Sequence, residues 1–165
     1  MFTVSVAKLK QAPAEERRYE LTGTIRSLPG GAAEPIPVVS PVVLVLTITN
    51  AGDFLWAVGE SRTTVRLACS RCLKEFAVEL AGRIEEKYRL HGAAGPEEEI
   101  PLAADDLDFT DQVIESLLLA LPMKPLCRED CRGLCPRCGK DLNEGACGCP
   151  AGEGDPRLAV LKKLL

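Results

Sequence analysis

The amino-acid sequence predicts an α+β fold, in which an antiparallel β-sheet core carries one packed amphipathic helix and precedes a cysteine-rich C-terminal region. Three observations support this prediction. Apolar and polar residues alternate strictly over residues 76–90, which is typical of a strand with one buried and one solvated face. Apolar residues recur at three- and four-residue steps over 110–121, as in an amphipathic helix. Six of the eight cysteines fall within residues 127–149.

The strands follow from local alternation and from β-branched runs bounded by turn residues. We expect strands at 2–6, 18–25, 42–49, 54–58, 63–69 and 76–90. Residues 27–41 hold five prolines or glycines before Val38 and predict a long, mobile connector. Turns are expected at 50–53 and around Gly59-Glu60-Ser61. Beyond the thiol pairs, no internal repeat is evident.

The prediction for the second half of the chain consists of a last strand, a loop and two helices. Within 76–90, Gly82 predicts a bulge or bend, and Glu86 on the apolar side suggests that the strand has passed the core edge. An acidic loop follows at 91–106. The helix at 110–121 has Thr110 or Asp108 as cap and ends at Pro122; its leucine face packs on the sheet or, alternatively, docks a partner helix. A short final helix is expected over Asp155–Leu165.

Composition limits the classes of function. The formal net charge is −4, and thiolates bound to metal would make it more negative, which argues against coating nucleic acid by charge alone. Residues 1–10 lack the apolar stretch of a secretory signal, and the prolines within 35–52 argue against a membrane span. We therefore expect a cytoplasmic protein with no membrane association, in which the cysteines stay reduced and bind metal instead of forming disulfides.

The cysteine spacing predicts metal sites, because tight turns can direct two thiolates at one ion. Eight thiolates fill two four-cysteine zinc sites with none left over, which predicts a zinc-ribbon-like region. The expected ligands are Cys69, Cys72, Cys127, Cys131, Cys135, Cys138, Cys147 and Cys149. We favour 69/72 with 127/131 and 135/138 with 147/149, because the eight residues between 138 and 147 suit a small closed knuckle. The crossed grouping of 69/72 with 135/138 stays open.

Together these patterns predict two regions packed as one domain. The first is a β-rich core over residues 1–122 that includes the helix at about 110–121. The second, over 123–165, is the cysteine-rich metal-binding region with the C-terminal helix.

No pattern predicts an enzyme. The spacing of Cys131, Cys135 and Cys138 matches that of radical S-adenosylmethionine enzymes, but only 27 residues follow, too few for their barrel. Cys-x-x-Cys can also serve redox chemistry, although here both such pairs lie among further cysteines in metal-site spacing. His91 is the only histidine, and no nucleophile or phosphate-binding motif occurs. We expect a non-enzymatic protein with closed structural sites and no small-molecule substrate.

Several motifs in order resemble the YceD family, a bacterial and plastid family also called large ribosomal RNA subunit accumulation proteins. The resemblance spans roughly residues 40–165. It is carried by Leu67-Ala68-Cys69-Ser70-Arg71-Cys72-Leu73 with Phe76, Leu121-Pro122 with Pro125, Cys127 and Cys131, Gly133-Leu134-Cys135-Pro136 with Cys138-Gly139 and Asp141-Leu142-Asn143, then Cys147, Cys149 and Asp155-Pro156-Arg157-Leu158. The resemblance implies a cytosolic, non-enzymatic factor needed for normal levels of large-subunit ribosomal RNA, associated with large-subunit proteins.

Three hypotheses for function remain at this point. The first is a ribosome-assembly factor that binds a large-subunit ribosomal protein, precursor ribosomal RNA or both. The second is a thiol oxidoreductase using Cys69 and Cys72, and the third is a zinc-ribbon nucleic-acid-binding protein. Within residues 124–140, five cations outnumber two carboxylates. We expect Arg71, Arg132 and Arg137 to contact the partner, or alternatively to offset the charge of the thiolate sites.

Overall fold

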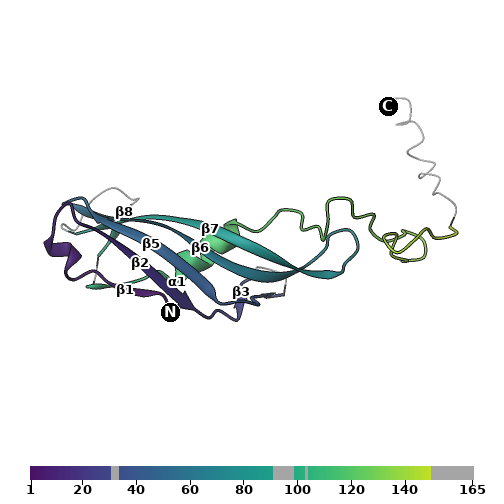
Figure 1. Ribbon diagram of the computed structural model, residues 1–165, viewed down its shortest axis with the longest axis horizontal. Helices are drawn as coiled ribbons and strands as arrows, with labels where there is room; N and C mark the ends of the chain where they lie inside the picture. The colour runs from purple at the N-terminus through teal and green to yellow at the C-terminus, as the bar shows by residue number, and fades with distance from the viewer. Residues whose placement is uncertain (31–33, 91–98, 103, 150–165) are drawn as a thin grey trace, which may run out of the picture.

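The computed structural model describes residues 1–30, 34–90, 99–102 and 104–149. At its centre is a five-stranded sheet in the order β2-β5-β6-β7-β8 (Figure 1). The strands are β2 (Glu16–Gly23), β5 (Val42–Asn50), β6 (Phe54–Ala68), β7 (Glu75–Arg89) and β8 (Glu99–Pro101). The first four pair antiparallel, and β8 lies parallel to β7. This confirms the predicted sheet core with one helix.

Short elements complete the fold. Strand β1 (Thr3–Ser5) pairs with β9 (Asp106–Asp108), and a 3-10 helix η1 (Leu9–Gln11) lies between β1 and β2. Strands β3 (Ser27–Leu28) and β4 (Ile36–Pro37) pair with each other. The predictions of a long, mobile connector over 27–41 and of an acidic loop over 91–106 therefore missed these short strands. β3 and β4 form a local hairpin-like pair, whereas β8 and β9 pair with β7 and β1, strands from outside their segment. Local composition does not reveal these pairings.

The two strands predicted at 54–58 and 63–69 form the single strand β6. Its pairing with β7 runs without interruption from Phe54 to Ala68, so no turn occurs at Gly59-Glu60-Ser61. Gly59 instead permits a close approach of β5, because a Cβ at this position would lie 2.1 Å from the carbonyl oxygen of Val45. Between two long neighbours, pairing on both sides outweighs the local turn preference.

Helix α1 (Thr110–Leu119) packs against β7 and β6, which confirms the helix and the sheet-facing position of its apolar side (Figure 1). The N-cap residue is Phe109, so neither Thr110 nor Asp108 occupies that position; the Asp108 carboxylate, one residue earlier, accepts a hydrogen bond of 2.9 Å from the backbone N–H of Thr110. Gly82 pairs in register with Ser61, so the predicted bulge is absent. A Cβ on Gly82 would lie 2.5 Å from the backbone carbon of Ser116, so glycine is needed for helix contact.

The core lies between the sheet and α1, with β1 and β9 closing one side. Its largest fully buried side chains are Phe2, Leu9, Leu28, Leu44, Leu46, Ile48, Leu55, Phe109 and Leu117. Tyr88 is only 4% exposed and packs edge-on against Phe109, with ring centroids 5.7 Å apart. The core thus continues beyond Glu86, contrary to expectation. The pKa of Glu86 is raised, mainly by its burial and to a lesser degree by the negative charge of Glu115.

The helix predicted over 155–165 lies outside the described residues. Among the described residues, no helix combines the length and apolar character needed to cross a membrane. The cysteine-rich segment lies beyond the end of the sheet at which β6 turns into β7, next to that turn (Figure 1).

Candidate metal centre

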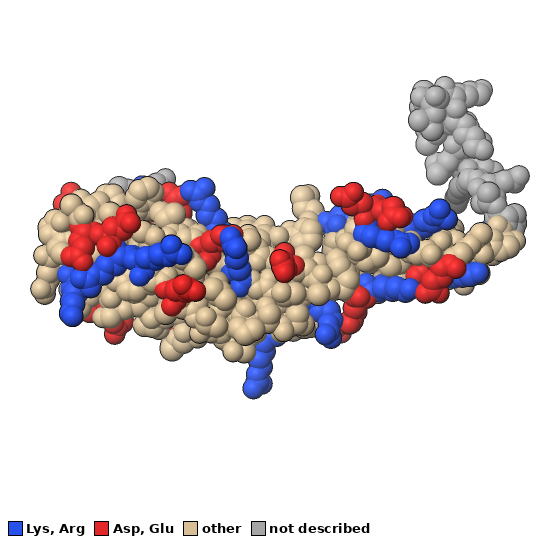
Figure 2. All heavy atoms as spheres, in the orientation of Figure 1, with Lys and Arg blue, Asp and Glu red and all other residues tan. Residues whose placement is uncertain are grey.

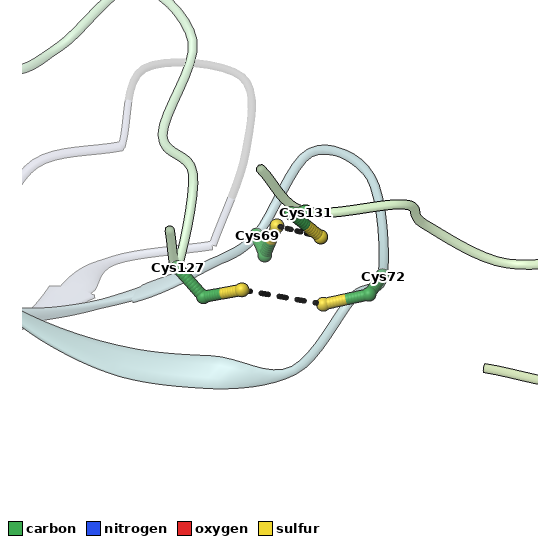
Figure 3. A group of neighbouring side chains, drawn as sticks. All are labelled: Cys69, Cys72, Cys127 and Cys131. Carbon is green, nitrogen blue, oxygen red and sulfur yellow. Dashed lines mark hydrogen bonds between the residues drawn. The ribbon is translucent and has the colours of Figure 1, made fainter. Parts of the chain in front are cut away.

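The first cysteine group joins the turn between β6 and β7 to a segment about 55 residues later. The Sγ atoms of Cys69, Cys72, Cys127 and Cys131 all lie within 4.8 Å of one another. Two facing pairs are visible in Figure 3: Cys69 and Cys131 have sulfur atoms 3.8 Å apart, and those of Cys72 and Cys127 are 3.7 Å apart. Two chain segments thus direct two thiols each at one point.

The second group is local. It consists of Cys135, Cys138, Cys147 and Cys149, whose Sγ atoms also lie within 4.8 Å of one another. These are the two groups that the spacing favoured, and neither contains the crossed combination of 69/72 with 135/138.

The sulfur separations suit a tetrahedral metal ion. Zinc–sulfur bonds of about 2.3 Å place the sulfur atoms of a four-thiolate site roughly 3.8 Å apart. A disulfide would need about 2.05 Å, and all eight cysteines have free thiols. The donor set, four soft thiolates in each group, is typical of structural zinc.

The two Cys-x-x-Cys turns have the same backbone structure. In the first, Leu73 donates its N–H to the carbonyl of Cys69, and the N–H of Cys69 donates to the carbonyl of Lys74; both distances are 2.9 Å. In the second, Gly139 donates to Cys135 at 2.9 Å, and Cys135 donates to Lys140 at 2.8 Å. The turns read Cys-Ser-Arg-Cys-Leu-Lys and Cys-Pro-Arg-Cys-Gly-Lys, a six-residue repeat that our sequence analysis missed.

The residue after the second cysteine has left-handed backbone geometry in both turns. Gly139 has φ +72°, which glycine adopts without strain, whereas Leu73 has φ +61° although it carries a side chain. The Leu73 side chain is 67% exposed, so burial does not offset this strain.

The thiols within each group differ in acidity. Burial would raise the pKa of Cys69, but backbone N–H groups of its own turn and of the facing segment outweigh this and lower it to about 6. Backbone N–H groups of the second turn likewise lower the pKa of Cys135 to about 6. Burial and then neighbouring thiols raise the pKa of Cys127 to about 12. Hydrogen bonding to Cys138 and then burial raise that of Cys149 to about 12. A divalent cation would allow all four thiols of each group to ionise together.

Arg71, predicted to contact a partner, makes contacts within the protein. Its Nη1 atom donates to the carbonyl oxygens of Cys131 at 2.6 Å and Glu129 at 3.3 Å. Its own carbonyl accepts the N–H of Leu134 at 3.2 Å. A Cβ on Gly133 would lie 2.9 Å from that carbonyl oxygen, so the two segments touch closely. Arg71 therefore holds the Cys131 segment against the β6–β7 turn.

Arg132 and Arg137 are exposed, and within the described part of the chain neither guanidinium has a hydrogen bond or ion pair. Figure 2 shows basic and acidic side chains close together at the cysteine-rich end of the molecule. A role of these two arginines in partner binding stays a prediction.

Four further polar residues support the site and were missed as such, although two lie in the Asp141-Leu142-Asn143 motif. Asn143 donates from Nδ2 to the Sγ atom of Cys131 at 3.4 Å. The Nζ atom of Lys74 contacts Asp141 Oδ2 at 2.9 Å and Glu144 Oε1 at 2.6 Å, which raises the pKa of Lys74. The motif was the available signal, but which atoms it contacts depends on the tertiary structure.

Comparison with known proteins supports a family assignment. An uncharacterized protein of Mycobacterium tuberculosis is 28% identical over 170 residues, covering 99% of this chain and 81% of the relative. One of Mycobacterium leprae is 27% identical over 131 residues, covering 76% and 60%. The uncharacterized protein YlbN of Bacillus subtilis is 33% identical over 102 residues, covering 60% and 59%.

No solved structure matches the chain significantly. The model of the family described as "Large ribosomal RNA subunit accumulation protein YceD" matches residues 57–165, more than half of the chain and the part that contains all eight cysteines. The chain therefore belongs to the YceD family, as the ordered cysteine motifs suggested.

Proposed function

We propose that this protein is a non-enzymatic ribosome-biogenesis factor that supports the synthesis, processing or accumulation of large-subunit ribosomal RNA. The observation that carries the proposal is the family match, because the matched residues include both cysteine groups and the family is described by large-subunit ribosomal RNA accumulation. The partners would be a large-subunit ribosomal protein, precursor ribosomal RNA or both. Such a factor acts in the cytoplasm, where reduced thiols are available for metal binding.

The two cysteine groups would each hold a structural zinc ion in a zinc-ribbon-like region. The sulfur separations of 3.7 and 3.8 Å in the first group support this, because they match the edges of a zinc–thiolate tetrahedron. Four protein ligands leave no coordination position for water or substrate, so the ions would stabilise structure instead of catalysing a reaction. The first zinc would fasten the cysteine-rich region, residues 123–165, to the core, residues 1–122, as one domain.

The low pKa of the Cys69 thiol favours the oxidoreductase alternative, because nucleophilic cysteines are thiolates. Against it, Cys69 is 0% exposed, so a disulfide substrate could not reach its sulfur atom without opening the turn. Metal content separates the two functions. Two tightly bound zinc ions per chain would support the structural role, and less than one, with fast-reacting thiols, would support the redox enzyme.

The partner surface would lie on the cysteine-rich region and include Arg132 and Arg137, both of which are exposed. Guanidinium groups suit bidentate contacts with phosphates or carboxylates. Arg71 would contribute mainly by holding this framework together, since its side chain already donates to two backbone carbonyls.

The decisive experiment is affinity capture of the full-length protein from a cell lysate, with and without nuclease. We expect large-subunit components to be enriched relative to small-subunit components. Capture that survives nuclease would identify a ribosomal protein as the direct partner, and capture lost with nuclease would identify RNA. Enrichment of unrelated nucleic acid would favour a general zinc-ribbon nucleic-acid-binding protein. Failure to enrich large-subunit components in either condition would overturn the assembly function.

A further inference from the structure

The two cysteine groups are connected through side chains of a single loop. This loop, residues 139–146, lies between Cys138 and Cys147 and is therefore closed by the second group. Three of its residues, Asp141, Asn143 and Glu144, nevertheless contact the first group or the β6–β7 turn. A metal ion in the second group would thus fix residues that surround the first.

Asn143 makes the most direct of these contacts. Its Nδ2 atom donates to Cys131 Sγ at 3.4 Å, and its Oδ1 atom accepts the backbone N–H of Arg132 at 2.8 Å. One amide side chain therefore holds both a ligand sulfur of the first group and the residue that follows it. Donors to a ligand atom orient it and tune its charge, and losing such an outer contact typically costs about 10–100-fold in metal affinity.

The same loop is held in place by a charged contact. Lys74, two residues after Cys72, pairs with Asp141 at 2.9 Å and with Glu144 at 2.6 Å. The side chain of Asp141 is only 10% exposed and also accepts the backbone N–H of Asn143 at 2.8 Å. The β6–β7 turn of the first group therefore contacts the loop of the second group directly, and Asn143 is oriented by both.

We infer that Asn143 is a positioning residue that couples the two metal sites, so that metal bound in either group strengthens binding in the other. The inference rests on the proposed metal sites. An ion held by the second group would fix the loop that carries Asn143, and with it the Asn143 amide beside the Cys131 sulfur. Thermodynamic linkage then requires the same factor in the reverse direction.

The test uses the full-length chain and zinc titrated against a chromophoric chelator. The wild type is compared with Cys147→Ser/Cys149→Ser, which keeps the first site, and with Cys127→Ser/Cys131→Ser, which keeps the second. If the sites are coupled, the product of the two dissociation constants of the wild type is smaller than the product measured in the two single-site variants. We expect a difference of about tenfold, the lower end of the range for outer contacts.

Asn143→Asp tests the residue itself without removing a ligand. The carboxylate keeps the acceptor for the Arg132 N–H, but it has no N–H to donate to Cys131 Sγ or to Asp141 Oδ1, to which Asn143 Nδ2 also donates at 2.7 Å. We expect Asn143→Asp to raise the product of the two zinc dissociation constants about tenfold above that of the wild type. The same substitution should have little effect on the first site when Cys147 and Cys149 are already replaced. With cobalt in place of zinc, the sulfur-to-metal charge-transfer band should also shift, which a loss of packing alone would not cause. Gln11→Glu, which makes the same amide-to-carboxylate change at an exposed position of η1, is the control.

The outcomes are distinguishable. Two results would overturn the coupling while leaving the metal sites intact. One is a product of dissociation constants that is equal in the wild type and in the two single-site variants. The other is an Asn143→Asp protein that binds both ions as tightly as the wild type does. A wild-type protein that binds no zinc would overturn the metal sites, and the coupling with them.

Discussion

Gly82 of β7 lies directly against the backbone of Ser116 in α1: a Cβ on Gly82 would be 2.5 Å from the Ser116 carbonyl carbon. Beside this contact, the hydroxyl groups of Ser61 and Ser116 are 2.8 Å apart and buried. Strand and helix therefore meet through their main chains at one point, and the hydrogen bond between the two serines marks the centre of the contact.

Replacing Gly82 by alanine should therefore destabilise the core. The added methyl group must displace backbone, and overpacking of this kind costs about 1–3 kcal/mol. Chemical denaturation measures the change in the free energy of unfolding. Ala81→Val, which adds bulk to the exposed neighbouring position of the same strand, is the control and should change stability little. Equal stability of the Gly82→Ala protein would contradict the close helix contact.

Asn50 should tolerate even an isosteric change poorly. Its side chain is 1% exposed; Nδ2 donates to the Leu9 carbonyl at 2.7 Å, and Oδ1 accepts the Gly52 N–H at 2.8 Å. In Asn50→Asp the carboxylate faces that carbonyl without a proton to share, which should cost about 1–3 kcal/mol at neutral pH.

The sign of the pH dependence follows from the same contact. Burial beside a carbonyl raises the folded-state pKa of the introduced carboxyl group, so the loss of stability should shrink as pH falls and the carboxyl becomes a donor again. Urea denaturation at a series of pH values measures this difference from the wild type. A deficit that does not change with pH would argue against the Leu9 contact.

The left-handed residues of the two thiol turns predict that adding glycine to the first turn and removing it from the second have opposite effects. Leu73→Gly should relieve strain at φ +61° and make the zinc in the first group harder to remove, whereas Gly139→Ala should introduce strain at φ +72° and make the second zinc easier to remove. Each substitution should change the stability of its turn by about 1 kcal/mol, which corresponds to a severalfold change in the release of zinc to a chelator. Zinc release to a chelator measures both, and the same direction of change in both variants would contradict the assigned geometry.

Arg71 and Arg137 occupy equivalent positions in the repeat and form a matched pair. Arg71→Gln should accelerate zinc loss, because it removes the donor to the Cys131 and Glu129 carbonyls. Arg137→Gln, alone or with Arg132→Gln, should leave zinc content and melting temperature unchanged but weaken partner binding and its salt dependence. If Arg137→Gln also releases zinc and binding per folded molecule is unchanged, these arginines offset thiolate charge and do not form the interface.

Zinc binding should release protons and become tighter as pH rises. The thiols of Cys127 and Cys149, whose pKa values are raised to about 12, carry protons at neutral pH and must lose them to become ligands. Titration calorimetry in buffers of different ionisation enthalpy counts the protons released. Binding without proton release would show that these thiols are not ligands.

The sequence by itself determined the features that depend on local periodicity and on loop length. The alternation over 76–90 was enough to predict strand β7, and the leucine spacing was enough to predict helix α1. The short loop between Cys138 and Cys147 was enough to predict which thiols lie together. Each of these patterns acts over a few residues, and no distant contact opposes it.

Only the tertiary structure decided the rest, because it depends on which segments become neighbours. Gly59-Glu60-Ser61 has the composition of a turn but remains extended, since β5 and β7 pair with it from both sides. Arg71 is exposed, as expected, but the sequence could not show that its side chain donates to carbonyls 58 and 60 positions away. The function of Asn143 at the Cys131 sulfur exists only once the second thiol group has closed its loop against the first, and a contact of that kind has no local pattern in the chain.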